Sequence, residues 1–172
     1  MRRILAVLLG VLAVMCAAQT ACAEEYNTYY IDEWGFEIGI PEECIVFTRD
    51  VDENHPGLEH FGFTAEALLE VLESGYIYID AIESSSAYEI VVVVQDDSAG
   101  NMKDWNEELL AAAIQSRQTY LKSKGHQCIS AQIVQHAQAT FLQNDYSSTS
   151  GQTTIYVREY YTRYNDTMYG VS

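Results

Sequence analysis

Three oxygen-bearing side chains in an acidic stretch have a spacing that suits a hard cation. Asp50, Asp52 and Asn54 alternate along the chain, so their side-chain oxygens can converge on one calcium ion. Two further positions of an EF-hand loop do not fit, because His55 stands where the loop requires glycine and Phe61 where it requires glutamate. The sequence excludes an EF-hand and leaves two alternatives, an irregular calcium site and a solvated acidic loop.

Two histidines follow in the same stretch. His55 and His60 are flanked by glutamates, and such a group can bind zinc. Pro56 and Gly57 lie between them and are expected to prevent a helix that fixes both imidazoles, and no His-Glu-x-x-His or Cys-x-x-Cys motif accompanies them. The sequence therefore does not favour a transition-metal site.

Tyrosine is the most unusual component of the chain, with 13 residues. A long strand is expected at residues 152–164, and its period of two places Tyr156, Arg158, Tyr160 and Tyr164 on one face. Aromatic rings beside a guanidinium can stack on a sugar, a peptide or a partner protein. These four residues are the candidate ligand-binding site, and the alternative is that this face packs beneath a helix.

Motifs for hydrolysis are absent from the sequence: there is no G-x-S-x-G, no S-x-x-K and no Gly-rich phosphate loop. The paired carboxylates Asp96 and Asp97 are neighbours in a loop, which does not set the separation that acid–base catalysis requires. The sequence thus favours a protein without enzymatic activity, and a hydrolase lacking a recognisable motif is kept as an alternative.

Residues 1–23 have the features of a secretory signal peptide. Arg2 and Arg3 precede an apolar run, and Ala21-Cys22-Ala23 suits a signal peptidase. The apolar run is shorter than the roughly 20 residues that a membrane span requires. We expect cleavage after Ala23, a single α+β domain at residues 24–172, a secreted or extracytoplasmic location, and no transmembrane segment in the mature chain.

The charge of the chain limits its partners. The formal net charge of −16 repels phosphate backbones, so nucleic acid is not expected to bind. An extracellular protein or a cell-surface component is the expected partner, and no cofactor is predicted except calcium at the acidic loop 50–54.

Cys44 and Cys128 are the two cysteines of the mature chain. An even pair in an exported protein suggests a disulfide, which would stabilise the fold by roughly 4 kcal/mol. The sequence does not decide between this bridge and two separately buried thiols.

The elements that position these residues follow from the hydrophobic pattern. Strands are expected at residues 29–32, 36–40, 44–48, 76–82, 88–95, 126–138, 139–146 and 152–164, with helices at 65–74 and 102–124 and a loop at 49–63. The strand at 88–95 is apolar on both faces, which is typical of a central strand. Short turns between successive strands predict an antiparallel α+β domain.

The end of the chain raises a question of its own. Asn165 and Asp166 favour a tight turn after the long strand, but only residues 167–172 remain to pair back.

The segment FEIGIPEECIVF, within this order of elements, resembles the start of PsbP-like domains. The longer segment YIDEWGFEIGIPEECIVFTRD is similar to uncharacterised exported proteins of anaerobic Gram-positive bacteria. The resemblance implies an antiparallel sheet with helices packed on its faces, a closing strand and a C-terminal helix. Since residues 167–172 do not provide that helix, we expect a PsbP-like sandwich that lacks it, ending early at Ser172 with tyrosine rings exposed.

Taken together, these features predict a secreted, non-enzymatic binding or protein-interaction domain. The alternative is a calcium-responsive extracellular module that uses Asp50, Asp52 and Asn54.

Overall fold

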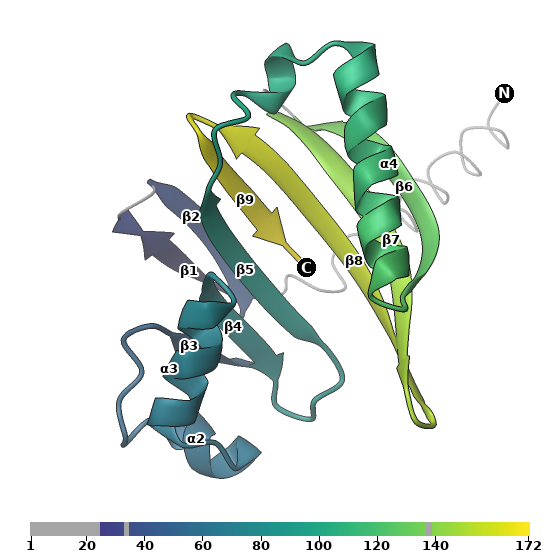
Figure 1. Ribbon diagram of the computed structural model, residues 1–172. Coiled ribbons are helices and arrows are strands. Elements are labelled where there is room, and N and C mark those ends of the chain that lie inside the picture. Colours follow the sequence, from purple (N-terminus) through teal and green to yellow (C-terminus); the bar gives the residue numbers. More distant parts are fainter. Residues whose placement is uncertain (1–24, 33–34, 137–138) are drawn as a thin grey trace, which may run out of the picture. The chain divides into compact units, whose positions relative to one another are not determined.

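The computed structural model describes residues 25–32, 35–136 and 139–172 (Figure 1), and the predicted signal peptide lies outside them. The chain divides into two compact units, Met1–Glu43 and Cys44–Ser172. Among the described residues, no helix has both the length and the apolar character needed to cross a membrane.

The described part of the first unit is a hairpin. Strand β1 (Tyr26–Ile31) pairs antiparallel with β2 (Phe36–Pro41). Gly35 has a φ of 58°, and its N–H donates to the carbonyl of Asp32 at 3.4 Å. Glycine adopts a positive φ without steric cost, so Gly35 helps to close the turn.

The second unit is built on a seven-stranded sheet in the order β3-β4-β5-β9-β8-β7-β6. Its strands are β3 (Cys44–Thr48), β4 (Ile77–Glu83), β5 (Glu89–Asp96), β6 (Gln127–His136), β7 (Ala139–Ser150), β8 (Thr153–Tyr164) and β9 (Thr167–Val171). Its helices are α2 (Pro56–Phe61), α3 (Ala65–Ser74), a short 3-10 helix η2 (Met102–Asp104) and α4 (Glu107–Ser123). All of the strand pairs are antiparallel, which confirms the predicted α+β class.

The short strand β9 joins the two halves of the sheet. Asn165 and Asp166 have φ values of 50° and 59°, the left-handed conformation of a two-residue hairpin turn. β9 then pairs with β8 on one side and with β5 on the other. The few residues after the turn therefore form a central strand, and β5 is central as predicted.

Helices α3 and α4 lie over the same face of this sheet. Phe47 of β3 is aligned with Val91 of β5 across the intervening strand β4. Val93 of β5 is aligned with Tyr161 of β8 across the intervening strand β9. Because Val91 and Val93 are two positions apart on β5, all four side chains point to one face. Phe47 packs among residues of α2 and α3, and Glu159, two positions before Tyr161, binds a side chain of α4. Figure 1 shows both helices in front of the strands.

The loop expected at residues 49–63 contains a helix, and this prediction was wrong. Pro56 occupies the first turn of α2, where its missing N–H is not required. The Nδ1 atom of His55 accepts a hydrogen bond from the N–H of Gly57 at 3.2 Å, so His55 caps the helix. Pro56 and Gly57 thus begin a helix instead of preventing one.

The helix predicted at residues 102–124 is divided in two. Trp105 and Asn106 separate η2 from α4, and the Asn106 side chain accepts a hydrogen bond from the N–H of Leu109 at 2.9 Å. Asparagine is a preferred N-cap residue, so the long helix begins at Glu107.

Asp80 is a buried carboxyl group on the face that carries α3. Its side chain shares a hydrogen bond with Glu89 of β5, and its Oδ1 atom has no partner among the described residues. Burial, together with the charge of Glu89 and the hydrogen bond, raises the pKa of Asp80 to about 7. A hydrogen bond between two carboxyl groups requires a proton, and in the folded protein Asp80 keeps one up to about pH 7.

We expect Asp80→Asn to raise the melting temperature at pH 8 by a few degrees and to change it little near pH 4. The folded protein retains a proton on Asp80 that the unfolded chain releases above the ordinary pKa of 3.8. The stability that this bound proton contributes is present in full below pH 3.8, and it is lost as the pH rises to about 7. Thermal melts from pH 4 to pH 8 measure the effect. Asp166→Asn, in the exposed turn, is the control, and an equal pH dependence of the two variants would contradict the assignment.

Candidate functional site

A groove lies over the central strands, between the end of α3 and the side of α4. Its volume is about 540 Å³, within the roughly 300–1,000 Å³ typical of small-molecule sites. Its lining comes from the residues after α3, from α4 and from strands β5, β7, β8 and β9: Gly75, Tyr76, Val93, Gln95, Ser116, Arg117, Tyr120, Tyr146, Glu159, Tyr160, Tyr161, Arg163, Met168, Gly170, Val171 and Ser172. Tyrosine and arginine dominate the polar part of this lining.

One wall of the groove is held by an ion pair between α4 and β8. The guanidinium of Arg117 donates from Nε to Glu159 Oε1 at 2.6 Å and from Nη2 to Oε2 at 2.5 Å. The amide of the fully buried Asn144 donates to the same Oε1 atom at 2.8 Å. Burial alone lowers the pKa of Arg117, but the hydrogen bonds and charge of Glu159 outweigh it and raise the pKa. Arg117 therefore stays protonated, and the carboxylate of Glu159 balances its charge.

The second guanidinium of the groove is also paired. Arg163 donates from Nε to Asp97 Oδ2 at 2.6 Å, and its Cζ atom lies 5.1 Å from the ring centre of Trp105. Burial raises the pKa of Asp97, but the hydrogen bond and charge of Arg163 lower it overall. The groove thus contains two cations, each neutralised by its own carboxylate.

Tyrosine rings line the space between these two pairs. Tyr120 is 48% exposed on the wall formed by α4, and its ring lies 4.8 Å from Cζ of Arg117. Tyr146 and Tyr161 are more buried, and burial raises the pKa of both phenols, so they remain neutral donors and acceptors at pH 7. The groove therefore presents rings and hydroxyl groups in surroundings without excess charge.

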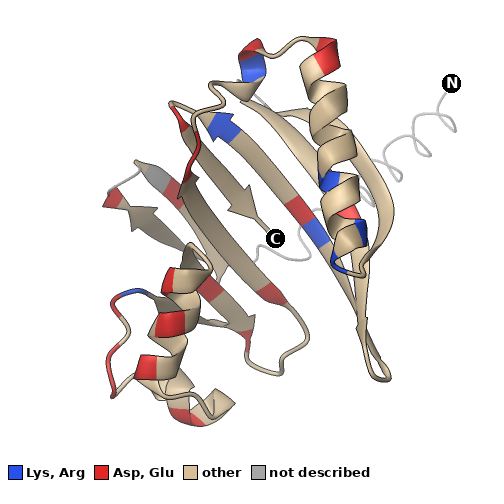
Figure 2. Cartoon of the chain, viewed as in Figure 1, with Lys and Arg blue, Asp and Glu red and all other residues tan. Residues whose placement is uncertain are grey.

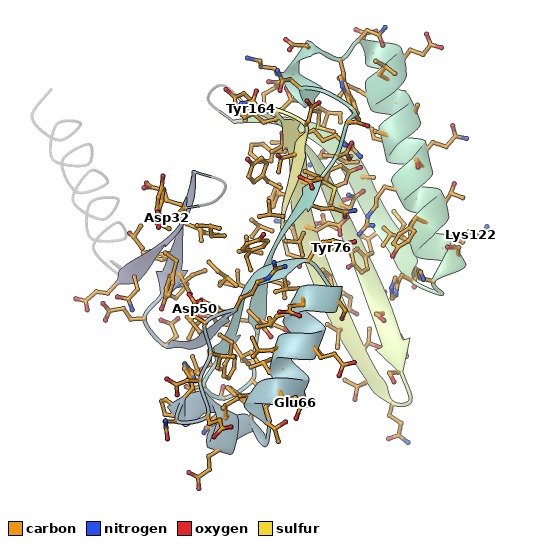
Figure 3. All side chains as sticks on the ribbon, turned by 60° about the vertical axis from the view of Figure 1, so that its left-hand side comes forward. Asp32, Asp50, Glu66, Tyr76, Lys122 and Tyr164 are labelled. Carbon is orange, nitrogen blue, oxygen red and sulfur yellow. The ribbon has the colours of Figure 1, made fainter. Side chains whose placement is uncertain are left out.

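Tyr76 holds an unfavourable backbone conformation at the opposite wall. Its φ is 56°, in the left-handed region, and its side chain is 52% exposed. In Figure 3 the labelled Tyr76 lies at the end of α3, next to the strands of the sheet. This conformation costs on the order of 1–2 kcal/mol for a residue other than glycine. The N–H of Tyr76 donates to the carbonyl of Glu73 at 3.2 Å, and its own carbonyl accepts from the N–H of Val94 at 3.1 Å, so this left-handed residue ends α3 and leads the chain into β4.

The tyrosine face predicted from the sequence lies mainly on the other side of β8. Tyr156 is 77% exposed, and Tyr164 and Arg158 are also largely exposed. Arg158 donates to Asp145 Oδ1 at 2.7 Å, so its charge is paired on that side of the sheet. Of the predicted residues, Tyr160 alone is among those that line the groove. The helix α4 covers the alternate face, which carries Glu159 and Tyr161.

The predicted calcium ligands are placed in the turn before α2. Asp52 Oδ1 accepts a hydrogen bond from the N–H of Asn54 at 2.7 Å, and the N–H of Asp50 donates to the Thr48 hydroxyl at 3.4 Å. Within residues 25–32, 35–136 and 139–172, no group of three His, Cys, Asp or Glu side chains is arranged to hold a metal ion. The oxygen of Asp52 is engaged in the turn itself.

The two histidines of this region have structural contacts. His55 caps α2. The Nε2 atom of His60 lies 2.9 Å from the carbonyl oxygen of Ser84. Each ring also packs against a phenylalanine, His55 on Phe47 and His60 on Phe61.

The structure does not bring the two cysteines together. Cys44 is on β3 and Cys128 is on β6, the opposite edge strands of the seven-stranded sheet. Neighbouring strands are about 4.8 Å apart, so this separation far exceeds the roughly 7 Å limit between Cα atoms of a disulfide. The bridge that the sequence left open is not formed within the chain.

Comparison with known proteins supports the fold. No protein-family model matches the chain, and no curated protein matches it. The chain is similar to the solution structure of cyanobacterial PsbP (CyanoP) from Synechocystis sp. PCC 6803, with a TM-score of 0.51 and 11% sequence identity over 88% of this chain and 81% of that chain. The PsbP-like fold expected from the sequence is therefore confirmed, and identity at this level shows the fold alone.

Proposed function

We propose that this PsbP-like domain is an extracytoplasmic binding module whose groove between α3 and α4 takes a neutral, hydroxyl-rich ring ligand such as an oligosaccharide. The observation that carries the proposal is the lining of the groove, in which tyrosines lie between two guanidiniums that are already paired. Aromatic faces stack on sugar rings, and phenol and guanidinium groups donate hydrogen bonds to hydroxyl oxygens.

Electrostatics supports a neutral ligand over an anion. Arg117 and Arg163 are each balanced by a carboxylate, and the chain as a whole has a formal charge of −16. Figure 2 shows acidic residues along both α3 and the loops. A negatively charged ligand has no unpaired cation in the groove to offset this field.

A binding role also accounts for the state of the ionisable groups better than catalysis does. Glu159 and Asp97 are the carboxylates nearest to the groove's guanidiniums, and both accept hydrogen bonds from them. A general base requires a carboxylate or imidazole that is available to accept a proton from the substrate.

The extracytoplasmic location is proposed from the basic start, apolar run and Ala21-Cys22-Ala23 of the sequence.

A fluorescence titration tests this function. The ring centre of Trp105 lies 5.1 Å from Cζ of Arg163, which lines the groove, so the emission of Trp105 is expected to change in a saturable way with a tetramer of N-acetylglucosamine or of glucose. Tyr120→Ala is expected to weaken binding about tenfold, the loss of roughly one stacking contact. Tyr156→Ala, on the other face of β8, is the matched control and is expected to bind normally.

Two further probes make the result decisive. Tyr76→Gly relieves the positive φ, so weaker binding by this variant does not arise from unfolding. A galacturonic acid tetramer has similar rings with negative charges and is expected to bind more weakly than the neutral tetramers. The absence of saturable binding by both neutral tetramers, or binding lost only in Tyr156→Ala, contradicts the assignment of the groove.

A further inference from the structure

The strand β6 is an edge of the seven-stranded sheet that lacks the usual protection against pairing. It pairs with β7 on one side, and no described strand pairs with its other side. Its sequence, QCISAQIVQH, contains no Asp, Glu, Lys, Arg or Pro over ten residues. Charged residues and proline are the devices that commonly prevent edge-to-edge association. One irregularity in register lies between Cys128 and Ser130, and the strand is regular from Ser130 onwards.

Helix α4 packs beside this edge and is itself poorly covered. Across its 17 residues, all of them described, Leu121 is the one side chain that is buried. Arg117 and Tyr120 line the groove, so they mark the side of α4 that faces the centre of the sheet. The other side of α4 faces the free edge. At 100° per residue, four exposed residues form one stripe along this side: Glu107, Ala111, Gln118 and Lys122.

From these features we infer that the β6 edge and this stripe of α4 form an interface with a second copy of the chain. In the dimer, β6 pairs antiparallel with β6 of the second copy, and the sheet continues across the two-fold axis. An axis perpendicular to the sheet keeps both α4 helices on the same face, where they run antiparallel beside each other. Two-fold symmetric pairs of this kind are the commonest soluble oligomers.

The stripe on α4 is complementary to itself under this symmetry. A two-fold axis between Ile114 and Gln115 places Glu107 opposite Lys122 of the second copy, and Ala111 opposite Gln118 of the second copy. Figure 2 shows acidic residues at the start of α4 and basic residues towards its end, and Figure 3 labels Lys122 there. The dimer therefore has two Glu107–Lys122 ion pairs, with small or neutral side chains between them.

The helix and the strand can share one axis. α4 covers about 25 Å at 1.5 Å per residue and β6 about 33 Å at 3.3 Å per residue, and a short turn at residues 124–126 joins them. Their midpoints, at residues 114–115 and 131–132, therefore lie at similar heights along the same edge. The negative charge of each chain opposes association, but β6 adds none to the contact, and physiological salt screens charges beyond about 8 Å.

Sedimentation velocity of the protein recovered from expression of the full chain, at two protein concentrations in 150 mM salt, tests the interface. We expect a concentration-dependent species with the mass of two chains. Gln132→Lys places a charge at the middle of the free edge and is expected to raise the dissociation constant about tenfold or more. Gln152→Lys, in the exposed β7–β8 turn, makes the same change of charge away from the edge and is expected to have no effect.

A charge exchange separates this symmetry from other modes of association. Glu107→Lys and Lys122→Glu alone are each expected to weaken the dimer, because each places like charges together at both ion pairs. The double variant restores opposite charges and is expected to recover the original dissociation constant. A protein that has the mass of one chain at all concentrations, a dimer unaffected by Gln132→Lys, or a double variant weaker than both single variants would overturn the inference.

Discussion

Replacing Glu159 with alanine is expected to lower the free energy of unfolding by about 3 kcal/mol, because it removes one partner from a largely buried ion pair. The change leaves the guanidinium of Arg117 without its carboxylate and the buried amide of Asn144 without its acceptor. Urea unfolding followed by circular dichroism measures the difference.

The matched control is the exposed ion pair between Arg158 of the same strand and Asp145. Arg158→Ala breaks the pair with Asp145, and because the Arg158 side chain is 61% exposed and solvent screens the pair, the expected loss is much smaller than that from Glu159→Ala. Equal losses in the two variants would show that the Arg117–Glu159 pair is no more important to the fold than an exposed one.

Phe47→Ala is expected to destabilise the second unit by about 4 kcal/mol, in the range for deletion of a buried aromatic side chain. Phe47 is 0% exposed and belongs to the cluster with Val51, Leu58, Leu68 and Leu72. Its loss leaves a cavity beneath α2 and α3 that these elements fill only in part.

The neighbouring ring of Phe63 provides the comparison for this variant. Phe63 contacts Phe47 at a centroid distance of 6.0 Å but is 41% exposed. Phe63→Ala is therefore expected to cost less than half as much in the same urea experiment. A loss from Phe47→Ala as small as that from Phe63→Ala would place the core elsewhere.

The local patterns of the sequence predicted most of the strands correctly. Alternation in the segment at 152–164 and the Asn165-Asp166 turn fixed the β8–β9 hairpin, because both depend on residues that are close in sequence. The central position of β9 could not be predicted in the same way. It depends on pairing with β5, which is about 70 residues away and is selected by tertiary packing.

Helix boundaries were predicted less well, because single side chains decide them. Asn106 starts α4 four residues after the apolar pattern begins, and His55 with Pro56 starts a helix within a stretch that has no clear period. These caps compete with the hydrophobic period as signals, and here the caps determined where each helix begins.

The groove was missed because it joins residues from distant elements. One signal was present: Arg117 interrupts the apolar stripe of α4, and Glu159 lies between Val157 and Tyr161 on the covered face of β8. Two opposite charges at positions expected to face a core indicate a partly buried ion pair. The sequence alone could not show that they face each other, since that depends on how α4 lies on the sheet.

The most direct test of the binding groove is an NMR titration of the isotope-labelled protein with the N-acetylglucosamine tetramer. The account predicts that chemical shifts change for Tyr76, Tyr120, Tyr161 and Gly170, which surround the groove. Shifts confined to Tyr156, Arg158 and Tyr164 on the other face of β8, or no shifts with either neutral tetramer, would contradict it.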